Sequence, residues 1–521
     1  MSTLAAGLSS GAVPSGWSIL VLTVLLTPAV ALVLVTLGRN RRYAELITVC
    51  SAILVMAQTL GLVAGVISQG EFSALSGYLY LDAFGALVLI PIAGVGFVAA
   101  LYSVSYMGRQ YERGVVDDRH LTRYYQGFNC FVLTMLLVPL SNNMGLMWVA
   151  IEATTLVSVF MIMLYTNQRA IEAAWKYLIV ATIGLSLALL GIVLFSYANT
   201  SASSPAAASG SGLNWTSMVA DAKLLDPGIV KIAFVFVLVG LGTKAGLAPM
   251  HTWLPDAHGE APTPVSALLS GVLLNCAIYG VLRFYIVASG TLGAALPSEL
   301  MIILGLLSMG IAAASIYFQK DMKRMLAFSS VEHMGIVSLA VGFGGFIGLF
   351  AALLHIVNHA IAKPLMFFAS GAVSQRYETK VMSEIRGVIK TMPLTGAVLL
   401  VGGLAIAGMP PFNIFLSEFL VLTSGFGGGQ FVAASLMLLL LVVIFAGFLR
   451  HLVPMVFGSP KGPGLVLTAS EGPGERGAGL SVLAIGVLVA LVVVLGLYVP
   501  QPLQTLIRDA VQVFGQGAPA L

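Results

Sequence analysis

One apolar stretch of the chain, LVGLGTKAGLAPMHTWLPDAHGEAPTPVSALLSG (residues 238–271), places a lysine, Lys244, among apolar residues and follows it with prolines at 249, 255, 262 and 264. Proline removes a backbone donor and breaks a helix. At membrane depth a broken helix is tolerated only where it lines protein or a wet cavity, and in transporters such breaks mark binding sites. The stretch therefore predicts an interrupted membrane helix beside an ion site.

The composition around this stretch is that of a membrane protein. Of the 521 residues, 58% are hydrophobic and 9% are charged, whereas a soluble domain has about 25% charged residues. So few charges cannot make a polar surface, and lipid must be the solvent. The net charge of +4 comes without a basic cluster, which argues against nucleic acid as a partner. Three cysteines, far apart, argue against a disulfide framework, and no basic region precedes the first apolar run, so no cleaved signal peptide is expected.

Apolar segments of about twenty residues, long enough to span a bilayer, follow one another along the chain. They lie near 17–38, 43–68, 81–106, 127–141, 144–166, 172–197, 229–250, 263–287, 299–319, 325–345, 347–372, 393–423, 431–457 and 479–499. We therefore expect an all-α polytopic membrane protein with about fourteen transmembrane helices, forming a single domain over residues 1–521.

The basic residues predict how the chain is oriented. Clusters of Arg and Lys follow only odd-numbered segments, for example at 39–42, 109–123, 320–324 and 376–390. Because cytoplasmic loops carry the excess of Lys and Arg, both termini are expected outside the cytoplasm.

Several ionisable residues lie within the apolar segments. Each costs roughly 2.5–3.5 kcal/mol on insertion and is functional by default. Glu152 lies in segment five among apolar neighbours, and Glu418 follows Pro410 and Pro411 in segment twelve. The others lie nearer the ends of segments six and ten, where a long side chain can instead reach water; they are Lys176, Glu332 and His333.

Segment eleven carries a polar stripe. His355, His359 and Lys363 are spaced at i, i+4 and i+8, so they share one helix face. The two histidines could ligate zinc, but neither a cysteine nor a helical carboxylate offers an obvious third ligand. A proton relay suits the stripe better, because histidine titrates near neutrality. No metal site is expected.

Segments seven and twelve have the same combination of features. Each combines a proline break with an ionisable residue, and they are five segments apart. Inverted repeats in transporters produce such pairs. We expect inverted five-helix repeats at 127–287 and 299–457 with broken helices seven and twelve, although sequence similarity between the halves is too weak to show this.

Cofactor chemistry has no signature in the chain. There is no Walker A motif, dinucleotide fingerprint or haem motif. We expect neither a cofactor nor catalytic residues here, and whether to call the chain an enzyme stays open, since any driving redox reaction would lie in other subunits.

Three motifs resemble one family. They are the stretch 244–271, KRMLAFSSVEHMG (323–335), and GMPPF (408–412) followed by Glu418. Together they resemble the antiporter-like subunits shared by respiratory complex I, Mrp-type cation/proton antiporters and membrane-bound group 4 hydrogenases. The resemblance covers nearly the whole chain. Asn275 and EAAWKY (172–177) are most similar to component F of hydrogenase-4 or formate hydrogenlyase.

The resemblance implies roles for particular residues. Glu152 corresponds to the helix-five glutamate of the family and Lys244 to its partner in helix seven, so the two are expected to form a coupled buried pair. Complex I relatives often carry a lysine in helix eight where this chain has Asn275, so the central relay would rest on histidines and water. Together with the other ionisable residues of the apolar segments, the expected proton path comprises Glu152, Lys244, His333, His355, His359, Lys363 and Glu418, with Lys176, Asn275 and Glu332 as secondary members.

The resemblance implies a proton-translocating subunit of a membrane-bound redox complex, related to group 4 hydrogenase or complex I, in a bacterial or archaeal cell membrane. Its partners would be other membrane and peripheral subunits, the bilayer and protons. One alternative is an Mrp-type sodium/proton antiporter subunit, because nothing in the sequence separates proton from sodium. Another is a passive membrane anchor for a hydrogenase-like arm, against which the buried charges argue.

Overall fold

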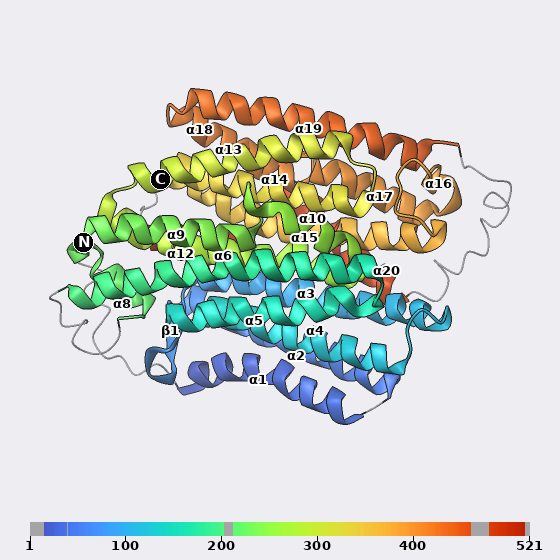
Figure 1. Cartoon of the computed structure of the whole chain (residues 1–521), viewed down its shortest axis with the longest axis horizontal. Coiled ribbons are helices and arrows are strands. Elements are labelled where there is room, and N and C mark those ends of the chain that lie inside the picture. The colour runs from blue at the N-terminus through green and yellow to red at the C-terminus, as the bar shows by residue number, and fades with distance from the viewer. Residues whose placement is uncertain (1–14, 39, 203–211, 460–478, 516–521) are drawn as a thin grey trace.

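The computed structural model describes residues 15–38, 40–202, 212–459 and 479–515, and helices make up nearly all of them (Figure 1). The helices and strands are α1 (Ser15–Gly38), α2 (Arg41–Gln69), β1 (Phe72–Ala74), β2 (Leu79–Leu81), α3 (Ala83–Glu112), α4 (Asp118–Leu140), α5 (Met144–Ile162), α6 (Gln168–Ser201), α8 (Trp215–Ala220), α9 (Pro227–Ala245), α10 (Trp253–Glu260), α11 (Thr263–Leu268), α12 (Leu274–Leu292), α13 (Ala295–Phe318), α14 (Met322–Phe343), α15 (Gly345–Tyr377), α16 (Val388–Thr391), α17 (Pro393–Ile406), α18 (Asn413–Gly427), α19 (Phe431–Phe457), α20 (Gly479–Leu497) and α21 (Gln501–Val513).

The predicted all-α membrane architecture is confirmed. Twelve helices of the described chain are long and apolar enough to cross a membrane, and each coincides with an expected segment. The other two expected segments differ: 127–141 falls on α4, which is not among the twelve, and 393–423 is divided between α17 and α18, which are shorter apolar helices. The total of fourteen spans therefore stays a prediction.

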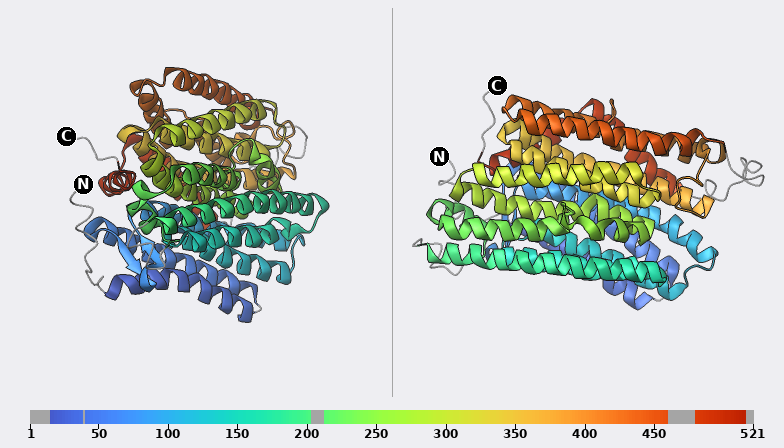
Figure 2. Two further views of the ribbon diagram at one scale, coloured as in Figure 1. Left: turned by 60° about the vertical axis from the view of Figure 1, so that its left-hand side comes forward. Right: turned by 45° about the horizontal axis from the view of Figure 1, so that its top comes forward.

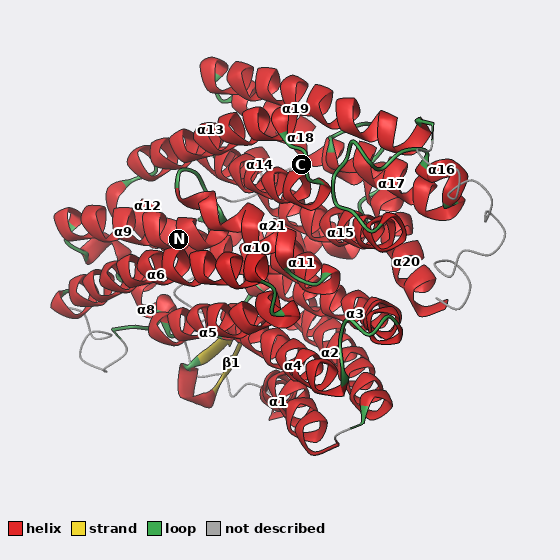
Figure 3. Cartoon of the chain, turned by 45° about the vertical axis from the view of Figure 1, so that its right-hand side comes forward, coloured by secondary structure: helices red, strands yellow, loops and turns green. Residues whose placement is uncertain are grey.

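The helices form a layered bundle. In Figures 1 and 2, α1 and α2 (blue) lie on the opposite side from α19 (orange), with the green and yellow helices between them. The short antiparallel hairpin β1–β2 packs beside α1 (Figure 3). The central position belongs to residues 263–292, whose most apolar window is 100% buried inside the protein. Residues 263–292 are thus shielded from lipid by the other helices.

Polar caps fix where many of the helices begin. An Asn or Asp side chain accepts a hydrogen bond from a backbone N–H of the first turn and so satisfies one of the free donors of that turn. The capping residues are Asn40, Asp82, Asp117, Asn143, Asn167, Asp226 and Asp321.

The expected break in segment seven is confirmed. Helix α9 ends at Ala245, Gly246 adopts a φ of +80°, and helix resumes in the turn Met250–Thr252 and in α10. Side chains provide hydrogen bonds for the backbone groups that the break leaves without a partner in the helix. Trp253 Nε1 donates to the carbonyl of Thr243 at 2.8 Å, and the Ala248 N–H donates to Ser308 Oγ at 2.9 Å. The break is therefore a stable part of the fold, with Lys244 in the last turn before it.

The second expected break, in segment twelve, is also present. Helix α17 ends at Ile406 and α18 begins at Asn413. Between them Gly408 has a φ of +73°, which favours glycine. A Cβ on Gly408 would collide with Glu418 Oε2, so a larger residue there would displace this carboxylate from its place beside the break.

Candidate functional site

Lys244 lies in a shell of hydroxyl groups. The side chain is fully buried, and its Nζ donates to Thr155 Oγ1 at 2.7 Å and to the hydroxyl of Tyr177. The Tyr177 hydroxyl is also hydrogen-bonded to Ser158 Oγ at 2.8 Å. The lysine of α9 is thus held by side chains from α5 and α6.

Glu152 lies close to this shell but not in contact with the lysine. Its side chain is partly buried; Oε1 accepts a hydrogen bond from Thr182 Oγ1 at 3.3 Å, and Oε2 is buried with no partner among the described residues. No ion pair within 4.0 Å joins it to Lys244 in the described chain. Instead Lys244 binds Thr155, three residues further along α5. The expected pair is therefore not in direct contact in this structure, and its coupling stays a prediction.

Across the molecule, histidines from neighbouring helices bond to one another. His333 Nδ1 on α14 lies 3.1 Å from His355 Nε2 on α15, and His355 Nδ1 lies 3.0 Å from Ser417 Oγ on α18. The His359 ring lies 5.3 Å from the His333 ring, centroid to centroid. All three rings are completely buried. The two hydrogen bonds form a chain through α14, α15 and α18 that ends at Ser417, next to Glu418, and the His359 ring lies beside this chain.

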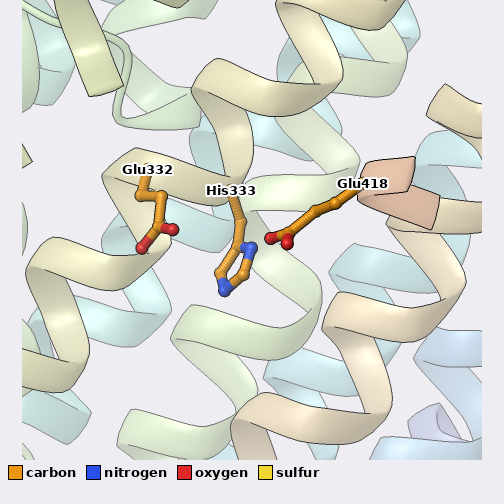
Figure 4. Close-up of side chains that lie close together, drawn as sticks. All are labelled: Glu332, His333 and Glu418. Atoms are coloured by element: carbon orange, nitrogen blue, oxygen red, sulfur yellow. The ribbon is translucent and has the colours of Figure 1, made fainter. Parts of the chain in front are cut away.

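Two carboxylates flank this chain. In Figure 4, Glu332 and Glu418 lie on either side of the His333 ring. Each of these three buried residues offers a ligand atom, and the three atoms lie within 4.8 Å of one another. Two carboxylate oxygens and an imidazole nitrogen are a ligand set that zinc accepts, with a fourth position open. The sequence did not suggest this set, because Glu418 comes from a helix 85 residues beyond His333.

Lys363 and Asn275 border the same region. Lys363 Nζ donates to the carbonyl of Leu326 at 3.1 Å and to the hydroxyl of Ser329. Asn275 Nδ2 donates to the carbonyl of Gly271 at 2.8 Å, while its Oδ1 is buried without a partner in the described chain. Asn275 follows a π-helical turn at Leu269–Leu273, and such turns are frequent at functional sites.

His258 is a candidate that the sequence analysis missed. It is fully buried in α10, and neither ring nitrogen has a hydrogen-bond partner among the described residues. The centre of its ring lies 6.0 Å from that of Trp253 and 6.1 Å from that of Phe367 on α15. The Trp253 ring is in turn 6.0 Å from Lys244 Nζ. His258 therefore lies between Lys244 and the polar face of α15. Its position within the stretch 244–271, where an interrupted helix beside an ion site is expected, was the signal that could have found it.

Lys244, His258, the histidines of α14 and α15 and Glu418 form a row of buried ionisable side chains. Many polar atoms along this row have no hydrogen-bond partner among the described residues. In the described chain they include Glu152 Oε2, both nitrogens of His258 and of His359, Asn275 Oδ1, Glu332 Oε2, His333 Nε2, Asn358 Oδ1, Asn413 Oδ1 and Glu418 Oε1. Leaving a buried donor or acceptor unsatisfied costs about 1–3 kcal/mol, and native proteins keep such groups where function or water uses them. The concentration of these atoms in one row marks it as the candidate ion route.

Lys176 lies apart from this row. Its side chain is 52% exposed and forms ion pairs with Glu172 at 2.6 Å and Asp256 at 3.4 Å. Asp256 also pairs with Arg324 at 2.6 Å. Lys176 therefore belongs to a surface network that connects α6, α10 and α14.

Known proteins are similar to the chain over most of its length. Residues 141–444 match the family model described as NADH:quinone oxidoreductase/Mrp antiporter, TM. The chain is 41% identical over 386 residues to a hydrogenase-4 component F homolog of Methylacidiphilum infernorum, covering 74% of this chain and 80% of that protein. It is 29% identical over 441 residues to NADH-quinone oxidoreductase subunit N of Desulforudis audaxviator, covering 83% and 84%.

Solved structures show the same fold. A chain of an archaeal membrane-bound sulfane sulfur reductase superposes with a TM-score of 0.81 at 25% identity, over 96% of this chain and 98% of that one. A chain of the Mrp complex from Dietzia sp. superposes with a TM-score of 0.80 at 20% identity, over 96% and 100%; at that identity the likeness concerns the fold alone.

Proposed function

The chain belongs to the NADH:quinone oxidoreductase/Mrp antiporter transmembrane family as an antiporter-like membrane subunit, and on that premise we propose that it carries protons between its two broken helices. The similarity to a hydrogenase-4 component F homolog supports a place in a hydrogenase-type redox complex, whose other subunits carry out the electron transfer. The Arg and Lys clusters after odd-numbered segments support termini outside the cytoplasm.

One observation carries the proposal: ionisable side chains lie in a row across the protein interior. The row begins at Lys244, passes His258, and reaches the His333–His355 pair and Glu418. The ends lie beside the breaks in segments seven and twelve. A passive anchor has no need of such a row, because each buried charge lowers the stability of the membrane protein.

A small movement of Glu152 could start the transfer. At an effective dielectric constant of 20, two unit charges attract by about 4 kcal/mol at 4 Å and by about 2 kcal/mol at 8 Å. Drawing Glu152 toward Lys244 would therefore favour the charged lysine, and moving it away would favour release of the proton. The shell of Thr155 and Tyr177 supplies hydroxyl partners for the lysine in either state.

The test is proton pumping by the parent complex in sealed vesicles, with electron turnover measured in parallel. Lys244→Met removes the titrating group but keeps a side chain of similar length, so pumping should be lost while electron turnover continues. Lys231→Met is the matched control, since Lys231 is on the same helix α9 and is exposed. Normal pumping by the Lys244→Met complex would refute the proposal. Replacing sodium with potassium in the same assay separates proton transfer from sodium/proton exchange.

A further inference from the structure

A groove with a cavity volume of about 280 Å³ lies apart from the row of ionisable residues, between α3, α15, α17 and α20. Small residues form much of its wall, among them Ala372, Ala397 and Gly486. A Cβ on Gly486 would meet no other atom within 4 Å, so this glycine leaves the groove open. The floor includes Tyr102, whose hydroxyl already donates to the carbonyl of Phe368 at 2.9 Å and whose ring stacks on the Phe368 ring at 4.1 Å.

The polar groups of the groove gather at one end. Arg109 lies in the last turn of α3, and Ser481 lies in the first turn of α20. The Ser481 hydroxyl is buried and has no hydrogen-bond partner among the described residues. Because α3 and α20 pack against each other, these groups lie at the end of the groove on the arginine-rich side.

Arg109 has a hydrogen-bond partner but no ion-pair partner among the described residues. Its Nε donates to Gln375 Oε1 at 2.9 Å, which orients the guanidinium group. Within the described residues no carboxylate lies within 4.0 Å of it. Arg113 lies beside it and donates to the carbonyl of Gln375 at 2.9 Å. An anion that reaches this end would meet an oriented cation and an unused hydroxyl.

The lining of the groove decides what kind of molecule suits it. Most of the lining residues are apolar, whereas the oriented guanidinium group and the unpartnered hydroxyl lie at one end. A molecule that suits the groove therefore has an anionic head for the polar end and an apolar tail for the rest. Acidic lipids of the bilayer have this form.

We propose that this groove binds one acidic phospholipid, with its phosphate group at Arg109 and Ser481 and one acyl chain between α17 and α20. A basic residue near the membrane surface contributes about 1 kcal/mol to the attraction of anionic lipid. The lipid would fill the space beside α20, whose most apolar window is 28% buried inside the protein. This site does not depend on the proposed proton route.

Lipid binding can be measured on the purified full chain in neutral detergent. Native mass spectrometry counts bound lipids, and thermal unfolding is followed while phosphatidylglycerol or phosphatidylcholine with identical acyl chains is added. We expect phosphatidylglycerol to bind about fivefold more tightly than phosphatidylcholine, as 1 kcal/mol corresponds to about that ratio. Inorganic phosphate alone should give no stabilisation, since it lacks the acyl chain.

Two pairs of variants locate the binding site. Arg109→Gln should abolish the preference for phosphatidylglycerol, whereas Arg169→Gln, an exposed arginine at the start of α6, should keep it. Gly486→Leu should fill the groove and weaken the binding of both lipids. Gly310→Leu is its control on α13, because a Cβ there also meets no atom within 4 Å.

Equal affinity for the two lipids would overturn the proposal, as would a preference that survives Arg109→Gln. Equal effects of Gly486→Leu and Gly310→Leu would place the acyl chain elsewhere, which also contradicts it. If Gly486→Leu does not fold, the ratio of the two lipid affinities in Arg109→Gln still decides the matter.

Discussion

The two broken helices hold their charged residues in different ways. Lys244, beside the first break, is surrounded by hydroxyl groups, and among the described residues Tyr177 is its one ionisable hydrogen-bond partner. Glu418, beside the second, shares its surroundings with Glu332 and His333, and its Oε1 has no partner in the described chain. The first site fixes one cation, while the second brings several proton acceptors together. We infer that the site at Lys244 controls the release of a proton and that the site at Glu418 collects protons.

The largest effect is expected where the first site loses its ability to release a proton. Lys244→Arg keeps a positive charge, but guanidinium does not deprotonate in proteins. Proton pumping should therefore fall nearly as far as in Lys244→Met, at constant electron turnover. Pumping at the wild-type rate would mean that Lys244 is a static structural cation, and the difference between the two sites would then disappear.

The second site can be broken without touching an ionisable residue. Gly408→Ala puts a methyl group where Glu418 Oε2 lies, since a Cβ at position 408 would collide with that oxygen. It also places a side chain at a φ of +73°. Pumping should fall about as far as in Glu418→Gln. Gly310→Ala, in open surroundings on α13, is the control and should pump normally.

An intermediate effect is expected for the histidines that join the two sites. His355→Ala and His359→Ala should each lower pumping while the complex still assembles. His258→Phe keeps an aromatic ring between Trp253 and Phe367 but removes both nitrogens, so it should lower pumping at unchanged thermal stability. His120→Phe, on the partly exposed start of α4, serves as the control. If His258→Phe pumps normally, the route between the sites bypasses α10.

Much of this architecture could be predicted from the sequence, because apolar length and proline position are local signals. The two breaks and the shared face of His355, His359 and Lys363 follow from spacing alone. The meeting of Glu332, His333 and Glu418 could not be predicted, since it depends on how α14 packs against α18. The family resemblance implied a direct pair of Glu152 and Lys244, whereas in this structure the side chains of Thr155 and Tyr177 take the contacts of the lysine. His258 was overlooked because burial of a proline-rich turn is a tertiary property.

The smallest effect is expected at Lys176, which the sequence grouped with the path and the structure places in a surface network. Its side chain is 52% exposed, and its partners are Glu172 and Asp256. Exposed ion pairs contribute about 0–1 kcal/mol and are screened by salt. Lys176→Gln should therefore change pumping by less than about twofold, and the change should shrink further at high ionic strength. A loss as large as that of Lys244→Met, insensitive to salt, would show that protons pass through Lys176 and that the first site extends to the surface of the protein.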